Sequence, residues 1–221
     1  FISLAAAAMT TRKVALMTSI AVAFARNPMS LAYLGNDLQN LSSGRFILGL
    51  GTQVKAHIER RFSMPWSRPA QRMRELVQAI RAIWYSWEND EKLDFHGEFY
   101  QHTLMTPVFT PSRSEHGMPP IFIAGVGPLM TEVAAEVGDG YFLHPFNTEK
   151  STDELSLEAI ERGLARAGKP RKDFTVCAQV ITATGLDEQS RRASIFGARK
   201  QIAFYASTPA YLPLLKCHGW E

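Results

Sequence analysis

The chain alternates between short apolar runs rich in β-branched or aromatic residues and longer segments whose apolar positions follow helical spacing. Runs of the first kind are typical of strands buried on both faces. They predict strands at residues 14–22, 46–50, 121–124, 141–143 and 174–181. Strands that alternate with helices predict an α/β protein with a parallel sheet and right-handed crossovers.

Apolar steps of three and four residues predict the helices. Asn27 is the candidate N-cap of the first of these, Pro28 fits its first turn, and Gly44 ends the run. The predicted helices cover residues 28–41, 69–87, 128–137 and 153–167, followed by a mostly helical tail from Asp187. In the second helix we expect a buried face of Met73, Leu76, Val77, Ile80, Ile83, Trp84 and Trp87.

Residues 92–118 interrupt this rhythm with Gly, Pro and alternating aromatic residues. Such a segment is typical of a hairpin or lid inserted into a fold. We therefore interpret residues 1–221 as a single domain that carries this insertion. A doubly wound sheet and a partial (β/α)8 barrel both fit the order of elements, and hydrophobic periodicity does not decide between them.

Composition narrows the functional classes. The chain is 46% hydrophobic and 20% charged, which is typical of a globular protein, and its net charge of +3 gives no electrostatic case for binding nucleic acid. Two cysteines cannot cross-link a fold of this size, which favours a reducing, cytoplasmic location. The apolar run from Phe1 to Met9 is too short to span a bilayer and lacks the basic start of a signal peptide, so no membrane partner is expected. Because the first residue is Phe1 and not Met, we expect a longer natural protein.

The segment "GLGTQV" follows the second strand and resembles a nucleotide loop. A dinucleotide fingerprint needs a third glycine where Val54 stands, and the Lys and Ser/Thr of a P-loop are missing. Two interpretations stay open. Gly49 and Gly51 let the strand end pack closely against its neighbours, or the backbone of Gly51, Thr52 and Gln53 faces a ligand at the carboxyl end of the strand.

The segment "IAGVGPLM" gives a more specific signal. A strand ends, Gly125 and Gly127 free the backbone, and Pro128 starts a helix. The N–H groups and dipole at such a helix terminus form an anion site, which favours phosphate binding over an ordinary turn. In "TSIA", by contrast, Thr18 and Ser19 are by themselves interpreted as core residues with satisfied hydroxyl groups.

Among the remaining polar residues we assign no catalytic acid or base. The six histidines are scattered without the spacing of metal ligands, so we expect no metal site. Six basic residues follow the second strand, and they belong either to a solvated helix face or to a rim for an acidic cofactor tail. These residues are Lys55, Arg60, Arg61, Arg68, Arg72 and Arg74.

Three segments together resemble a known family. "LMTSIAVAFARNPM", "LSSGRFILGLGTQ" and "PPIFIAGVGPLMTEVAAEVGDGYF" are similar in order and spacing to the luciferase-like monooxygenase superfamily, and most of all to its oxidoreductases that use the deazaflavin coenzyme F420. "HIERRFSMPW" resembles one subfamily of that branch. The resemblance implies a (β/α)8 TIM barrel that is incomplete here, with about five of the eight strands.

The resemblance also implies roles for the strand ends. The first strand would carry a bulge at Ser19–Ile20, often with a non-prolyl cis peptide, that backs the flavin-like ring. The end of the second strand would line the cofactor cleft, and the turn after the third strand would hold the cofactor phosphate. The implied cofactor-binding residues are Thr18, Ser19, Ile20, Gly51, Thr52, Gln53, Gly125, Val126 and Gly127.

The function implied is hydride transfer between reduced F420 and a small organic substrate, which the sequence does not identify. One branch of the family has an acidic proton donor where Val54 stands, so the reaction of that branch is not implied. The alternatives are an FMN-dependent luciferase-like monooxygenase and a non-catalytic barrel relative that acts as a binding subunit. Because an open barrel exposes unpaired strand edges, we expect a homodimer or a larger homo-oligomer.

Overall fold

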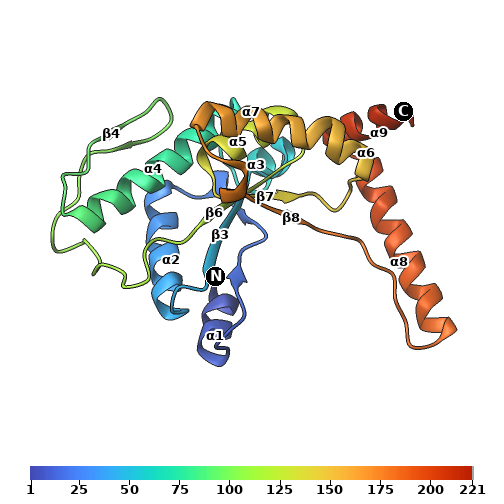
Figure 1. Cartoon of the computed structure of the whole chain (residues 1–221), viewed down its shortest axis with the longest axis horizontal. Helices are drawn as coiled ribbons and strands as arrows, with labels where there is room; N and C mark the ends of the chain where they lie inside the picture. The colour runs from blue at the N-terminus through green and yellow to red at the C-terminus, as the bar shows by residue number, and fades with distance from the viewer. Residues whose placement is uncertain (221) are drawn as a thin grey trace.

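The computed structural model describes residues 1–220 and contains one parallel sheet, as the alternation of strands and helices predicts (Figure 1). Its strands are β1 (Leu16–Met17), β2 (Ala21–Val22), β3 (Phe46–Gly51), β6 (Ile121–Gly125), β7 (Gly140–Leu143) and β8 (Thr175–Ala178). The order is β1-β3-β6-β7-β8, and β2 pairs with β3 beyond β1. Because β1 and β2 both pair with β3, they are two parts of one interrupted strand, and the sheet has five strand positions.

Nine α-helices lie before, between and after the strands of residues 1–220. They are α1 (Ile2–Thr10), α2 (Pro28–Leu41), α3 (Lys55–Arg60), α4 (Pro69–Asn89), α5 (Pro128–Val137), α6 (Glu149–Ser151), α7 (Glu158–Ala167), α8 (Glu188–Ala206) and α9 (Leu212–His218). A π-helical segment, Thr152–Leu157, joins α6 to α7, and short 3-10 turns lie at Ala23–Ala25, Arg171–Asp173 and Pro209–Tyr211. The side chain of Asn27 caps α2 by accepting a hydrogen bond from the Ser30 N–H.

Several predicted boundaries are wrong. The strand predicted over residues 14–22 begins at Leu16 and is interrupted between Met17 and Ala21. The helix predicted to begin at residue 153 begins at Glu149, because Thr148 and Ser151 form a capping box. The last strand, predicted over residues 174–181, pairs with β7 only over Thr175–Ala178. Beyond Ala178 the chain leaves the sheet for the tail.

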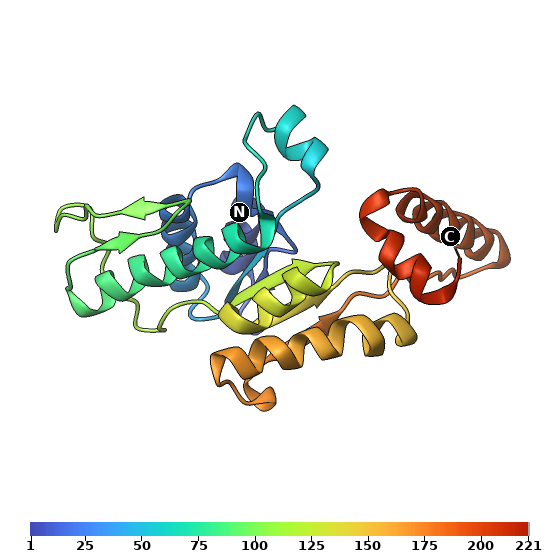
Figure 2. The ribbon, with the colours of Figure 1, turned by 90° about the horizontal axis from the view of Figure 1, so that it is seen from above.

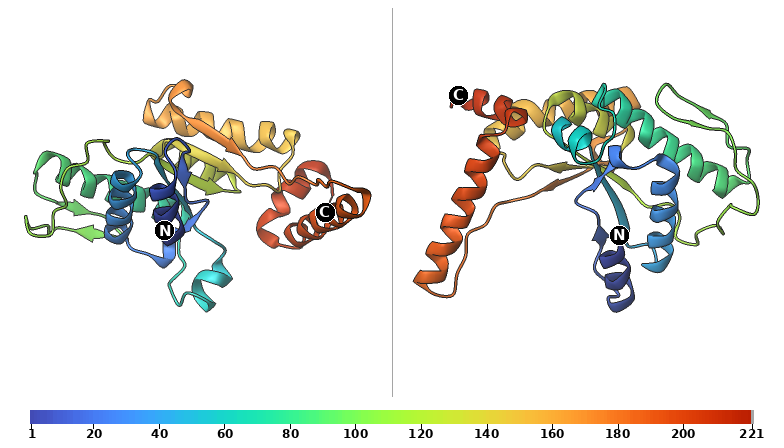
Figure 3. Two further views of the ribbon diagram at one scale, coloured as in Figure 1. Left: turned by 90° about the horizontal axis from the view of Figure 1, so that it is seen from below. Right: turned by 180° about the vertical axis from the view of Figure 1, so that it is seen from behind.

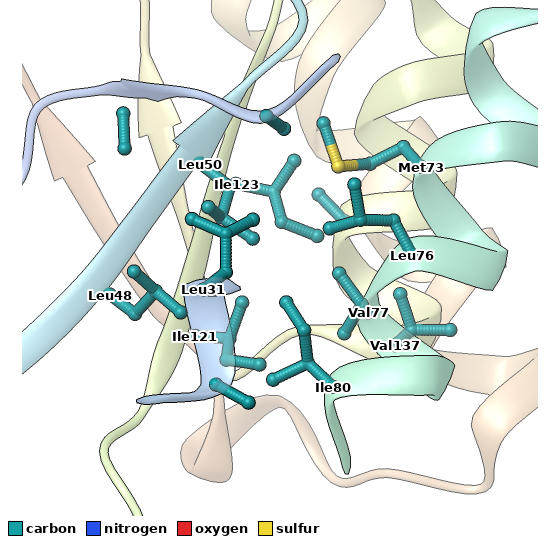
Figure 4. Close-up of a cluster of buried hydrophobic side chains, with 14 of the residues drawn as sticks. Leu31, Leu48, Leu50, Met73, Leu76, Val77, Ile80, Ile121, Ile123 and Val137 are labelled. Carbon is teal, nitrogen blue, oxygen red and sulfur yellow. The ribbon is translucent and has the colours of Figure 1, made fainter. Parts of the chain in front are cut away.

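The core lies between one face of the sheet and the surrounding helices (Figure 4). Leu48 and Leu50 of β3 and Ile121 and Ile123 of β6 are fully buried there. They meet Leu31 of α2, Val137 of α5, and Met73, Leu76, Val77 and Ile80 of α4. All seven residues of the face predicted for α4 are buried, which confirms the helical periodicity read from the sequence.

The sheet curls into a half-barrel and is not flat. Gln179 directly follows β8, at one edge of the sheet, and Ser19 lies between β1 and β2, at the other edge. The Gln179 side-chain amide nevertheless donates a hydrogen bond of 2.6 Å to the Ser19 hydroxyl. Only a curved sheet brings its two edges so close, which favours the partial barrel over the doubly wound alternative. Among the described residues, the outer edges of β1 and β8 have no strand partner.

The segment 92–118 contains an antiparallel hairpin of β4 (Phe95–His96) and β5 (Gln101–His102). Glu75 of α4 holds its turn by accepting hydrogen bonds of 2.6 to 2.9 Å from three successive backbone N–H groups, those of residues 98–100. The hairpin follows α4, at the opposite end of the molecule from α8 and α9 (Figures 1 and 2).

The tail, from Asp187 onward, packs less against the sheet than the preceding part of the chain does. Helix α8 has 19 residues, none of them buried, and it projects from the body (Figure 3). The tail contacts the body through an aromatic cluster, defined here as Tyr205 and Tyr211 of the tail with His144 and Phe146 after β7. It also contacts the body through α9, where the Cys217 thiol donates to the Glu154 carboxylate at 3.2 Å and the His218 Nε2 lies 2.7 Å from the Thr148 hydroxyl. The His144 and Tyr211 rings stack with centroids 4.5 Å apart. Among residues 1–220, no helix has both the length and the apolar character needed to cross a bilayer.

Candidate functional site

The strand ends named by the sequence lie side by side. In the register of the sheet, Val22 of β2 is the neighbour of Gly51 of β3, and Gly51 is the neighbour of Ala124 of β6. All three strands are parallel, so their carboxyl ends lie together at one end of the sheet, which we call the carboxyl edge to distinguish it from the outer strands β1 and β8. Barrels of this kind carry their catalytic residues at this end. The structure therefore brings the Ser19–Ile20 bulge, the residues 51–53 and the turn 125–127 to adjacent positions.

The bulge is built by Thr18. Its hydroxyl donates to the Gly49 carbonyl at 2.7 Å and accepts from the Gly49 N–H at 2.9 Å, which takes the place of a regular ladder. The side chain is buried, as expected for a satisfied core hydroxyl. The following peptide bond, Ser19–Ile20, is cis, as the family resemblance implies. The side chain of Thr18 therefore shapes the strand, while Ser19 is exposed beyond it.

The two glycines of β3 make room for this bulge. A Cβ atom on Gly49 would lie 1.7 Å from the Thr18 carbonyl oxygen, and one on Gly51 would lie 2.8 Å from the side chain of Ile20. No real side chain tolerates such distances, so the close-packing interpretation of these glycines is the one that the contacts support. Through this packing, β3 places Ile20 at the carboxyl edge.

Beyond β3 the chain turns sharply. Gln53 is exposed and has a left-handed φ of 62°, and its carbonyl accepts a hydrogen bond of 2.8 Å from the Thr52 hydroxyl. This turn directs the chain into α3, which stands clear of the sheet in Figure 2. Thr52 and Gln53 thus form the rim of the edge next to the bulge.

Two glycines lie where β6 leads into α5: Gly125 is closely packed, whereas Gly127 has free space around it. A Cβ on Gly125 would lie 2.6 Å from Met130, and the Gly125 carbonyl accepts a 2.6 Å hydrogen bond from the Tyr141 hydroxyl, whose pKa is raised mainly by burial. Gly127 begins α5 as its N-cap, without a side-chain cap, and a Cβ there would meet nothing within 4 Å. The first turn of α5 is therefore accessible to an anion.

The structure reduces the basic rim from six residues to three. Arg68 pairs with Glu98, and Arg74 pairs with Glu136 at 2.7 Å. Arg72 is buried below the Phe24 ring and donates to the Tyr100 hydroxyl and the Pro65 carbonyl. Partners in the hairpin, in α5 and in the loop before α4 thus already engage these three residues. Lys55, Arg60 and Arg61, on and just after α3, are exposed.

Sequence reasoning missed the ends of β7 and β8. His144 directly follows β7, and its Nδ1 accepts a hydrogen bond of 3.1 Å from the Phe146 N–H. In the neutral ring the proton is therefore on Nε2, which faces the Tyr211 hydroxyl at 3.0 Å. Burial lowers the pKa of His144 to about 4, so the ring is neutral near pH 7. Its place at a strand end was the available signal.

A hollow of about 370 Å³ lies between the ends of β7 and β8 and the tail. Its walls include Phe146, Gln179, Ile202, Leu214, His218 and Trp220. None of the nine residues implied as cofactor-binding lines it. The hollow nevertheless adjoins them, because Gln179 both lines it and donates to Ser19. Within residues 1–220, no three His, Cys, Asp or Glu side chains are grouped closely enough to hold a metal ion.

Comparison with known proteins places this geometry in a family. The model of the luciferase-like monooxygenase family matches residues 1–221. An uncharacterized protein of Mycobacterium tuberculosis is 53% identical over the whole chain, and the chain covers 65% of it. An F420-dependent glucose-6-phosphate dehydrogenase of Intrasporangium calvum is 30% identical over 77% of this chain and 51% of its own length.

A solved structure shows the same fold. The coenzyme F420-dependent tetrahydromethanopterin reductase of Methanopyrus kandleri superposes with a TM-score of 0.78 at 24% identity, over 98% of this chain and 62% of that protein. The chain thus spans between about half and two thirds of the length of these proteins. The five strand positions correspond to part of a TIM barrel.

Proposed function

Because the chain belongs to the luciferase-like monooxygenase family, we propose that it is an oxidoreductase that transfers hydride between reduced coenzyme F420 and an organic substrate. One observation carries the proposal: the bulge at Ser19–Ile20, the end of β3 and the open turn at Gly127 share one edge of a parallel half-barrel. A relative with 30% identity is named as F420-dependent. When bound, the deazaflavin supplies the carbon that carries the hydride.

The residues of this edge fit such a cofactor in three ways. Ile20, held by the bulge against Gly51, offers an apolar surface for a flat ring. The uncapped first turn of α5 offers a positive dipole end and the Leu129 N–H for a phosphate, since Pro128 has no N–H and Met130 already gives its own to the Gly127 carbonyl. Ser19, Thr52 and Gln53 would complete the rim, and the nearby tail would limit access of water to the edge.

The choice of F420 over FMN rests on charge. FMN ends in one phosphate, whereas the deazaflavin continues into a tail that carries several carboxylates. Lys55, Arg60 and Arg61 are exposed shortly after the end of β3. Within residues 1–220, Lys55 is the one of the three that has a carboxylate within 4 Å, that of Glu59 at 3.9 Å. An acidic tail gains from such a rim, and a single phosphate has no need of it.

Two alternative functions, an FMN-dependent monooxygenase and a non-catalytic binding subunit, each have an observation in their favour. The uncapped turn at Gly127 by itself suits a single phosphate, which favours an FMN-dependent monooxygenase. None of the residues implied as cofactor-binding is a carboxylic acid or a histidine, which favours a non-catalytic binding subunit. The two unpaired sheet edges, at β1 and β8, further support a homodimer or larger homo-oligomer, which light scattering would detect.

An anaerobic titration of the protein with each cofactor, followed by absorbance, tests the proposal. We expect F420 to bind more tightly than FMN, with an affinity that falls as salt rises. Tighter FMN binding that is insensitive to salt would identify the monooxygenase. Binding of neither cofactor, together with no hydride transfer from reduced F420 to any acceptor, would leave the binding subunit.

A further inference from the structure

The hollow beside the proposed cofactor edge is lined by apolar and uncharged polar residues together with one histidine. Of its thirteen lining residues, none is Asp, Glu, Lys or Arg. Apolar side chains dominate one wall, among them Phe146 from the end of β7, Ile202 of α8 and Leu214 of α9. A volume of about 370 Å³ is within the range of small-molecule sites. A charged ligand would lose its hydration here without gaining an ionic partner from the lining.

Five lining residues carry polar side chains, and all five already have hydrogen-bond partners. Asn147 and Ser151 bond to each other. The His218 Nε2 lies 2.7 Å from the Thr148 hydroxyl, and its ring stacks on Trp220 with centroids 4.2 Å apart. Gln179 gives one amide N–H to Ser19. An amide has a second N–H and a carbonyl oxygen, so Gln179 retains one donor and one acceptor. These can pair with a carbonyl or a hydroxyl group.

Gln179 also fixes where such a pair would form. Its amide touches the bulge that we assign to the cofactor ring, and its side chain lines the hollow. A ligand whose apolar part fills the hollow would thus bring its oxygen-bearing carbon toward the ring. A group that is to give or receive hydride needs this placement, since transfer requires the two carbons in contact.

We propose that the hollow is the substrate site, and that it takes a neutral, largely apolar alcohol or ketone whose oxygen pairs with Gln179. The inference rests on the proposed function for its chemistry, because the hydroxyl and carbonyl forms are the two sides of a hydride transfer. The proposed site differs from one that binds a phosphorylated sugar, because the phosphate of such a sugar needs cationic side chains.

Equilibrium dialysis of the protein with two probes tests the inference. The probes are 2-acetonaphthone, an apolar ketone, and fructose 6-phosphate, a polar anion. Ile202→Asp places a carboxylate in the wall of the hollow. Phe196→Asp is the matched control, because Phe196 is exposed on the same helix and lines no part of the hollow. Val180→Asp, in the strand-to-tail connection that also lines the hollow, serves if the first variant does not fold.

We expect the ketone to bind, and Ile202→Asp to weaken its binding by roughly tenfold or more, with Phe196→Asp unchanged. Equal binding to both variants, or binding of the sugar phosphate in place of the ketone, would overturn the inference. A cofactor titration of the same samples keeps the two proposals apart. If neither cofactor binds while the ketone binds in the hollow, the hydride-transfer function fails and the apolar site remains.

Discussion

Helices α4 and α8 have nearly the same length, 21 and 19 residues, but they relate to the sheet in opposite ways. Helix α4 buries ten residues, whereas α8 buries none. Local signals are stronger in α8, which has a capping box of Asp187 and Ser190 and two ion pairs from Glu188. Capping sets where a helix begins, and burial against the sheet sets where it lies.

The difference separates the molecule into two regions with distinct roles. Strands β2, β3 and β6 pack against the core that α4 covers. The proposed cofactor-binding residues at their carboxyl ends are therefore held by rigid elements. The tail contacts the body through the aromatic cluster and through α9, and it forms one wall of the hollow. Such a division is suited to a fixed cofactor and a substrate that must enter and leave.

The largest effect should come from the core of α4. Leu76 is fully buried between α4 and the sheet, so Leu76→Ala should lower the free energy of unfolding by about 2–5 kcal/mol. Phe196→Ala on α8 removes a side chain that is 71% exposed and should change it by less than about 0.5 kcal/mol. Denaturant titration measures both. Equal losses would show that α8 packs against something in solution.

The aromatic cluster should control the tail alone. Tyr211→Ala removes the ring that stacks on His144, an interaction of about 1 kcal/mol. Amide hydrogen exchange in α8 and α9 should then become faster, with exchange in α4 unchanged. Tyr85→Ala, an exposed tyrosine on α4, is the matched control and should leave the tail as it is. Faster exchange throughout the chain would mean that the tail is part of one cooperative unit.

Gly125, at the end of β6, and Gly127, at the start of α5, should separate binding from folding. Gly127→Val places a branched side chain in open space at the N-terminus of α5, so it should weaken F420 binding by roughly tenfold with little change in melting temperature. Gly125→Val forces a side chain against Met130 and should lower the melting temperature. If Gly127→Val melts early and keeps its affinity for F420, the turn has only a structural role.

Much of the rigid region could be predicted from the sequence, and little of the tail. The seven apolar positions of α4 and the strands they cover follow from periodicity, and the cis bond at Ser19–Ile20 followed from the family resemblance. The contact between Gln179 and Ser19 spans 160 residues and depends on the curl of the sheet, which no local pattern records. The same holds for Arg68 and Arg72, whose partners lie in the hairpin.

Mild acid should loosen the tail before it affects the core. Burial holds the pKa of folded His144 at about 4, below its ordinary 6.5. The undocked ring therefore binds a proton first, and docking weakens as the pH falls from about 6.5 toward 4, with no effect above that window. Hydrogen exchange of α9, corrected for its intrinsic pH dependence, should report this. His144→Phe should remove the pH dependence, and its persistence would assign it to another group.

The smallest effect, a few-fold change in affinity, concerns the cofactor tail. Exposed ion pairs contribute only about 0–1 kcal/mol each and weaken as salt rises, so Lys55, Arg60 and Arg61 can adjust the affinity for F420 without creating it. The double variant Arg60→Ala, Arg61→Ala should weaken F420 binding at low salt and leave FMN binding unchanged.

Arg199→Ala with Lys200→Ala removes the same charge from α8, where both side chains are exposed, and is the control for net charge. Equal losses from the two double variants would mean that the whole protein attracts the acidic tail. A loss confined to the α3 pair, abolished by high salt, would place that tail beside α3 and leave the hollow free for the substrate.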